Sequence, residues 1–209
     1  MGRYLGPSCK LCRAGKTKLF LKAEKCYTNC ILDKGIRKNI GSASAQTRKM
    51  TEYARHLNEK QKLKRMLCLN EETFKNYFRI ASRMKGLTGK NLLFLLERRL
   101  DNTLRKMGFV QSIKSARQLI SHGHILVNNK IIKTPGYLVN IGDKILFKKS
   151  DKFKENLLIT QSLQRTGDLV PSWLTVNKEN LEGQVVNLPK EEDFSFPIDV
   201  SLIVELYSK

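Results

Sequence analysis

Four cysteines near the start of the chain constrain its fold more than any other feature. Cys9, Cys12, Cys26 and Cys30 follow the pattern C-x2-C-x13-C-x3-C, which is typical of a single tetrahedral site with four thiolate ligands. The segment that holds them is too short to build a hydrophobic core, so metal binding would drive its folding. The pattern therefore predicts a structural metal knuckle.

Zinc is the metal that this ligand set favours, because four soft thiolates fill a tetrahedral site and leave no position open for catalysis. Two alternatives stay open. Four cysteinates can also hold an iron–sulfur cluster, and the side chains can remain as reduced free thiols. The fifth cysteine, Cys68, stands alone in a helical pattern, so we expect it to be a small buried apolar residue.

The positive charge of the chain is large and unevenly distributed. Its 209 residues include 39 Lys and Arg against 19 Asp and Glu, for a formal charge of +20. Residues 160–209, here called the acidic end, hold four basic and eight acidic groups, a balance of −4. The excess in the preceding part predicts a polyanionic partner, most commonly nucleic acid. We expect the acidic end to face protein or to pack on its own chain.

The sequence predicts a cytoplasmic protein without a membrane segment. No apolar run reaches the roughly 18 residues of a membrane span, and the first residues lack the apolar core of a signal peptide. Thiols stay reduced in the cytosol, which favours metal binding over disulfides for the four cysteines.

Apolar spacing and turn residues predict an α+β fold. Three predicted domains follow: an N-terminal cysteine knuckle and linker (1–47), a helical domain (48–90), and an α/β domain (91–189). We expect residues 190–209 to complete the helical domain. In that segment a helix capped by Asp199, packed around Phe74 and Phe78, is favoured over a strand.

Two helices are predicted at the start of the α/β domain. Leucines at helical spacing predict one helix from Asn91 to Met107. Ser112 can cap a second helix that runs to His122. The two helices would carry several basic side chains.

The run His122-Gly123-His124 is best explained as a corner in the backbone. Gly123 fits the residue that ends a helix, and alternating apolar residues after it predict a β-hairpin that turns at Asn128-Asn129. A metal site is disfavoured because no Cys, Asp or Glu close in sequence would complete it.

Basic side chains around this corner predict a surface that contacts RNA phosphates. Arginine suits this role because its planar guanidinium can bind two phosphate oxygens at once. The predicted RNA-binding residues are Arg98, Arg99, Arg105, Lys106, Lys114, Arg117, His122, Lys130 and Lys133.

Several segments resemble one family of ribosomal proteins. Within residues 97–158, approximately, the chain contains RLDNTLRKMGF, SARQLISHGHILVNNK and PGYLVNIGDKI. In this order they resemble the small RNA-binding module named after the S-four ribosomal proteins. The rest of the chain contains RYLGPSCKLCR, LFLKAEKC, LNEKQKLKR, LTGKNLLFLLERRLDN and LIVELYSK. The chain is identified as a member of the bacterial-type S-four family of the small ribosomal subunit.

The resemblance implies a structural protein rather than an enzyme. It implies binding to a multi-helix junction in the 5′ domain of small-subunit ribosomal RNA, nucleation of subunit assembly and an influence on decoding accuracy. It also implies contact with the neighbouring protein S-five, contact of Arg48 and Lys49 with incoming messenger RNA, and repression of the protein's own operon. The expected location is the cytoplasmic ribosome, with an organellar ribosome as the alternative.

Two departures from the family pattern stand out. GSASAQ replaces a Gly-Gln-His-Gly-like run near position 44, and the last cysteine pair is spaced one residue closer than in zinc-bearing members. The competing function is an RNA-modifying enzyme or an RNA chaperone that carries the same module. The enzyme is disfavoured because the sequence outside the module offers no Gly-rich phosphate loop and no Ser/His/Asp set.

Overall fold

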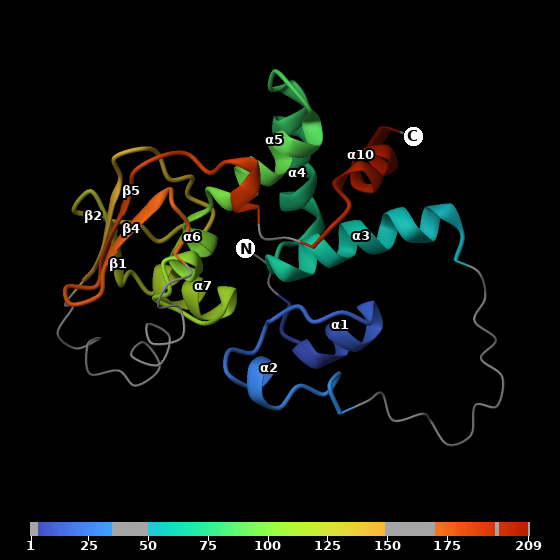
Figure 1. Ribbon diagram of the computed structural model, residues 1–209, viewed down its shortest axis with the longest axis horizontal. Helices are drawn as coiled ribbons and strands as arrows, with labels where there is room; N and C mark the ends of the chain where they lie inside the picture. Colours follow the sequence, from blue (N-terminus) through green and yellow to red (C-terminus); the bar gives the residue numbers. More distant parts are fainter. Residues whose placement is uncertain (1–3, 35–49, 149–169, 195–196, 209) are drawn as a thin grey trace. The chain divides into compact units, whose positions relative to one another are not determined.

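The structure is a computed structural model that describes residues 4–34, 50–148, 170–194 and 197–208. It combines helices with one antiparallel sheet (Figure 1), which confirms the predicted α+β class. The chain divides into two compact units, Met1–Asn76 with Phe196–Lys209 and Tyr77–Ser195. The boundary falls within a helix, whereas the sequence placed a boundary after residue 90.

The first unit is helical. Its elements are α1 (Ser8–Gly15), α2 (Lys25–Thr28), α3 (Glu52–Met66), the first part of α4 (Glu71–Arg83) and α10 (Val200–Ser208). The N-terminus of α3 is capped by Thr51, whose hydroxyl accepts a hydrogen bond from the Ala54 amide at 3.3 Å. Asn70 caps α4 in the same way, through Thr73 N at 2.8 Å. These caps fix where the two helices begin.

The end of the chain is helical, as the sequence favoured, and α10 packs against α3. Asp199 accepts a hydrogen bond from Ser201 N at 3.0 Å just before the helix. Ile203 is fully buried, and the ring of Tyr207 stacks on buried Phe74 with a centroid distance of 6.4 Å. The predicted packing around Phe74 is therefore confirmed, whereas Phe78 is only half-buried.

A charge cluster ties α10, α3 and α4 together. The Glu71 carboxylate accepts hydrogen bonds from Lys60 and Lys64, each at 2.7 Å, and from the Tyr207 hydroxyl at 3.4 Å. Partial burial disfavours the charged form of Glu71 and by itself would raise its pKa. The hydrogen bonds and charges of the two lysines outweigh this effect and lower the pKa of Glu71 to about 2. Burial, together with the Glu71 charge, raises the pKa of Tyr207 to about 12.

Replacing Glu71 with Gln is expected to destabilise the protein near neutral pH and to matter less in acid. A carboxyl with a lowered pKa stabilises the fold above its usual pKa of 4.5, and this contribution is lost as the pH falls toward about 2. The side chain is 48% exposed, so solvent screening limits the loss to about 1 kcal/mol. Urea unfolding between pH 7 and pH 3 measures it, with Glu72→Gln as the exposed control. A difference from wild type that does not shrink in acid would contradict the assignment.

In the second unit, α6 (Leu100–Lys106) and α7 (Ile113–Ser121) share one hydrophobic core with a five-stranded sheet. The unit also contains the rest of α4, α5 (Thr88–Glu97) and a 3-10 turn at Glu191–Asp193. The strands are β1 (Ile125–Val127), β2 (Lys130–Ile131), β3 (Lys144–Phe147), β4 (Leu174–Asn177) and β5 (Glu182–Val185). Their order is β2-β1-β3-β5-β4, and every neighbouring pair is antiparallel. The core includes Leu104, Ile120, Ile145 and Trp173.

The single helix predicted from residue 91 to residue 107 is wrong, because the structure has two helices there. The helix is interrupted at Arg99. This residue is extended (φ −67°, ψ 135°) and forms an isolated β-bridge with Leu138. Leu100 N donates to Tyr137 O at 2.8 Å, and Val139 N donates to Arg98 O at 2.9 Å. These hydrogen bonds to a distant segment replace the bonds of a continuous helix. The spacing of leucines within residues 91–107 gives no information about such distant partners, so it could not predict the interruption.

The predicted corner and hairpin are confirmed. Ser112 caps α7 by accepting a hydrogen bond from Ser115 N at 3.2 Å, and Gly123 takes the left-handed conformation with φ 73°. The hairpin between β1 and β2 turns at Asn128 and Asn129, whose φ values are 50° and 65°. Two positive φ values are what a tight hairpin turn requires.

The acidic end contributes strands that the sequence did not predict. β5 pairs with β3, with Ile145 opposite Gly183, and β4 adds the outer strand. A Cβ on Gly183 would lie 2.4 Å from the sulfur of Met107, so glycine allows this core residue to approach the sheet. The expectation that the acidic end packs on its own chain holds for these strands and for α10.

Candidate nucleic-acid interface and cysteine cluster

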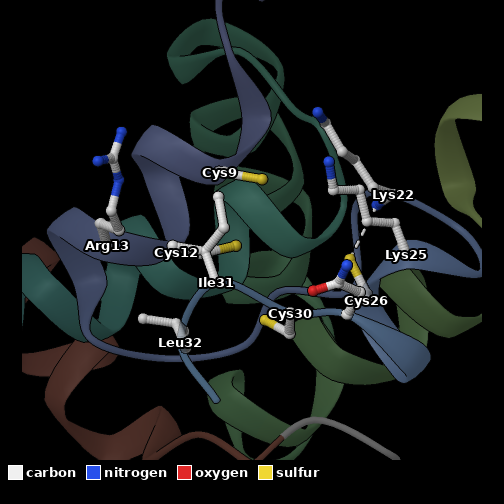
Figure 2. Close-up of a pocket in the computed structure, with 10 residues that line it drawn as sticks. Cys9, Cys12, Arg13, Lys22, Lys25, Cys26, Cys30, Ile31 and Leu32 are labelled. Carbon is white, nitrogen blue, oxygen red and sulfur yellow. Dashed lines mark hydrogen bonds between the residues drawn. The ribbon is translucent and has the colours of Figure 1, made fainter. Parts of the chain in front are cut away.

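The four cysteines line one pocket (Figure 2). Cys9 and Cys12 come from α1, Cys26 comes from α2, and Cys30 follows α2. Cys12 and Cys26 are each 8% exposed. Their sulfur atoms turn toward the same space, and Lys22 N donates a hydrogen bond to the Cys26 sulfur at 3.2 Å. The fold therefore brings together the residues that the sequence grouped.

The chemistry of this pocket fits a soft cation, although the sulfur atoms are not closely spaced. Burial raises the pKa of the Cys12 thiol, and the other three cysteines raise it further, against a backbone hydrogen bond from Leu19. Thiolates in such a pocket need a cation to stabilise them. In the described part of the chain, however, no three of the four sulfur atoms lie within 4.8 Å of one another. A closed tetrahedral site would require them to move inward.

A second cluster of metal-ligand type joins α3 and α10. Glu52, His56 and Glu205 place one donor atom each within 4.8 Å of one another. His56 is 3% exposed, and its Nε2 lies 3.1 Å from a Glu205 oxygen. The cluster was missed from the sequence, because Glu205 follows His56 by nearly 150 positions. The geometry is that of a polar contact between a histidine and two carboxylates that holds α10 against α3.

Two predicted RNA-binding residues belong to the interior, which corrects the prediction. Arg99 is 2% exposed and binds both Asp101 oxygens, at 2.6 and 3.0 Å, and the Tyr77 hydroxyl at 2.7 Å. Lys106 is 8% exposed and lies 3.0 Å from a Glu97 oxygen. Because these charges are paired inside the fold, they are not offered to a phosphate at the surface.

Two further arginines are half-buried and also serve the fold. Arg98 donates to Val139 O at 3.0 Å and to the Asn140 side chain at 2.6 Å, and it lies over the Phe94 ring at 5.1 Å. Arg105 donates to the Asn102 side chain at 3.2 Å. Its Nε is buried without a hydrogen-bond partner among the described residues.

On α7, Lys114 is half-buried, and the guanidinium of Arg117 lies 4.0 Å from an Asp101 oxygen. His122, at the end of this helix, is exposed, and its ring lies 6.0 Å from that of His124. The sequence placed both histidines correctly at the corner. Arg48 and Lys49 lie outside the described residues, as do residues 149–158 of the predicted module.

Exposed lysines surround the β-hairpin. Lys130 follows its turn, and Lys144 lies beside that turn because its amide donates to the Asn128 side chain at 3.0 Å. At the other end of the hairpin, Lys148 N donates to His124 O at 2.8 Å, and the Lys133 side chain lies close to Gly123. We call these four residues the hairpin lysines. Lys144 and Lys148 were missed, although alternation with buried Ile145 and Phe147 could have revealed Lys144.

A small module of two helices on a β-hairpin ringed by lysines defines a class of RNA-binding protein. Residues 98–145 match the S4 domain, and residues 3–97 match the family described as "Ribosomal protein S4/S9 N-terminal domain". Three curated relatives, each covered in full and covering this chain in full, carry the name small ribosomal subunit protein uS4. They come from Endomicrobium trichonymphae (48% identical), Thermoanaerobacter pseudethanolicus (47%) and Halothermothrix orenii (44%).

The chain therefore belongs to the small ribosomal subunit protein uS4 family, and the predicted S-four resemblance is confirmed. It is a structural constituent of the ribosome rather than an enzyme. Among the described helices, none combines the length and apolarity needed to cross a bilayer.

Proposed function

We propose that the chain binds the 5′ domain of small-subunit ribosomal RNA through the hairpin lysines, holding a multi-helix junction in one geometry and nucleating assembly. The observation that carries this proposal is the exposure of all four lysines around a single hairpin. RNA duplexes are recognised mainly by shape and by contacts to phosphates and 2′-hydroxyls. Lysines at a junction offset the repulsion between phosphates where helices converge.

The buried charges support this proposal indirectly. Arg99 and Asp101 lie within one module with the hairpin lysines and fix the break between α5 and α6. Fixed backbone geometry positions a set of cations at little entropic cost when RNA binds. The interior pairs thus order the module, and the lysines bind the phosphates.

Replacing Lys130, Lys133 and Lys144 with Gln is expected to weaken binding to a 5′-domain transcript by tenfold or more. The slope of log affinity against log salt should flatten by about 0.9 for each phosphate that is no longer neutralised, because fewer counterions are released. Filter binding at several salt concentrations measures both values. The control is Lys178→Gln with Lys190→Gln in the acidic end, which should stay within about twofold of wild type. Equally weakened binding in the two variants would contradict the assignment of the interface.

We also propose a structural zinc ion held by Cys9, Cys12, Cys26 and Cys30. Support comes from their shared pocket, the burial of Cys12 and Cys26, and a donor set of four soft thiols. Bound zinc would supply a cross-link between α1 and the segment around α2. It would have no catalytic role, because four protein ligands leave no open position.

Contacts with messenger RNA and with protein S-five are further proposals, which rest on the family resemblance. Arg48 and Lys49 would grip incoming messenger RNA, and the acidic end would border S-five and influence decoding accuracy. Repression of the protein's own operon would use the same RNA-binding surface.

Ribosomes carrying Arg48→Ala and Lys49→Ala are expected to stall more on structured messages. Unchanged progress through a stable hairpin would count against this role.

A further inference from the structure

Two exposed aromatic rings stand together in the cysteine-rich segment. Phe20 is 39% exposed and Tyr27 is 55% exposed. Their ring centroids are 5.2 Å apart, with an angle of 33° between the planes. Single exposed apolar residues are common on protein surfaces, but a paired aromatic patch often marks a binding site.

The backbone directs Phe20 away from the local core. The residues on either side of it, Leu19 and Leu21, are each 4% exposed and pack with Cys12. Phe20 itself has φ 49°, in the left-handed region that bulky side chains rarely adopt. Strained conformations of this kind cluster at ligand-binding sites. Local folding alone gives no reason for a large aromatic ring at this position.

The charges of this segment favour an anionic ligand. Residues 4–34 contain seven Lys and Arg residues against two acidic residues. One acid, Asp33, is already bound to Lys18 at 2.6 Å. Lys22 and Lys25 are exposed and line the cysteine pocket (Figure 2). In the sequence, Lys22 lies two residues after Phe20, and Lys25 lies two residues before Tyr27.

We propose that the Phe20–Tyr27 pair is a stacking platform for an unpaired nucleotide of RNA. An unpaired base offers a flat apolar face that can stack on an aromatic ring, while nearby lysines attract its phosphates. A continuous duplex hides these base faces. The inference rests on the proposed RNA-binding function and adds a second contact, in the first unit. An acidic protein surface is the competing partner.

The test is aromatic NMR on the full-length protein with two RNA probes, eight-nucleotide oligo(rA) and a fully paired two-stranded RNA duplex at the same phosphate concentration. Stacking of adenine should shift the ring signals of Phe20 and Tyr27 upfield with the single strand but not with the duplex. The variant Phe20→Leu with Tyr27→Leu should bind oligo(rA) about tenfold more weakly, with an unchanged salt dependence. Tyr53→Leu removes an exposed ring from α3 and should leave oligo(rA) affinity unchanged.

Three results would overturn the platform: unmoved ring signals, equal shifts with the paired duplex, or a crosslink to protein rather than RNA. The crosslink would come from a photoreactive phenylalanine analogue at position 27 in assembled subunits. The ring signals of the wild-type protein decide the question even if the double variant fails to fold. Binding of the 5′-domain transcript through the hairpin lysines is a separate readout. The platform can therefore fail while the proposed function stands, and the reverse also holds.

Discussion

A protein in which Cys12 and Cys26 are both serine is expected to bind no zinc and to lose the fold of residues 4–34. These are the two most buried of the four thiols, and a serine hydroxyl does not replace a thiolate ligand. The local core is small, with Cys12, Leu19 and Leu21 as its buried members. Apparent free energies of structural zinc binding are about 10–16 kcal/mol, which such a core cannot replace.

Elemental analysis and limited proteolysis measure this outcome. The wild-type protein should carry about one zinc ion per chain, and residues 77–148 should resist protease in both proteins. Cys68→Ser is the matched control, since Cys68 packs beside this core but lies outside the four-cysteine pattern. Wild-type protein free of metal under reducing, chelator-free conditions would refute the zinc site. Visible charge-transfer absorbance would indicate iron instead.

Replacing Asp101 with Asn is expected to destabilise the second unit by about 3–5 kcal/mol, because it leaves a buried guanidinium without its counter-charge. Arg99 and Asp101 are 2% and 0% exposed, and two hydrogen bonds join them. Urea unfolding of the full-length protein measures the destabilisation. The control is Glu191→Gln, which breaks the exposed pair with Lys90 and should cost at most about 1 kcal/mol.

A double variant, Arg99→Met with Asp101→Leu, provides a further check. Apolar residues of similar volume can replace a buried ion pair at little cost, so this variant should recover most of the stability that Asp101→Asn removes. If Asp101→Asn lowered the free energy of unfolding by no more than the Glu191→Gln control, the buried pair would not contribute the stability that its burial predicts. Recovery in the double variant would separate the cost of an unpaired charge from the cost of poorer packing.

Local features of the fold were predictable from the sequence. The cap at Ser112, the corner at Gly123 and the turn at Asn128-Asn129 depend on residues within a few positions of each other. Each uses a side chain or a φ angle that only a few residue types provide. The grouping of the four cysteines followed in the same way from their spacing.

Features that depend on distant partners were not predictable. Arg99 is buried by Tyr77, 22 positions away, and Lys106 donates to the Asp193 carbonyl, 87 positions away. Their spacing within a basic run looks the same as that of surface residues. Predicted RNA-binding residues therefore included interior charges and missed Lys148, whose place beside His124 is set by pairing of backbone groups across the sheet.

The packing of α10 on α3 has a consequence for synthesis of the chain. The Asp199 amide donates to Glu59, 140 residues earlier, so α3 emerges long before its partner. At about 5–20 residues per second, this interval is on the order of 10 s. The second unit, Tyr77–Ser195, is fully synthesised within that interval. The first unit to emerge therefore finishes folding last. Slow decoding ahead of residue 200 would prolong the time during which α3 lacks α10 packed against it.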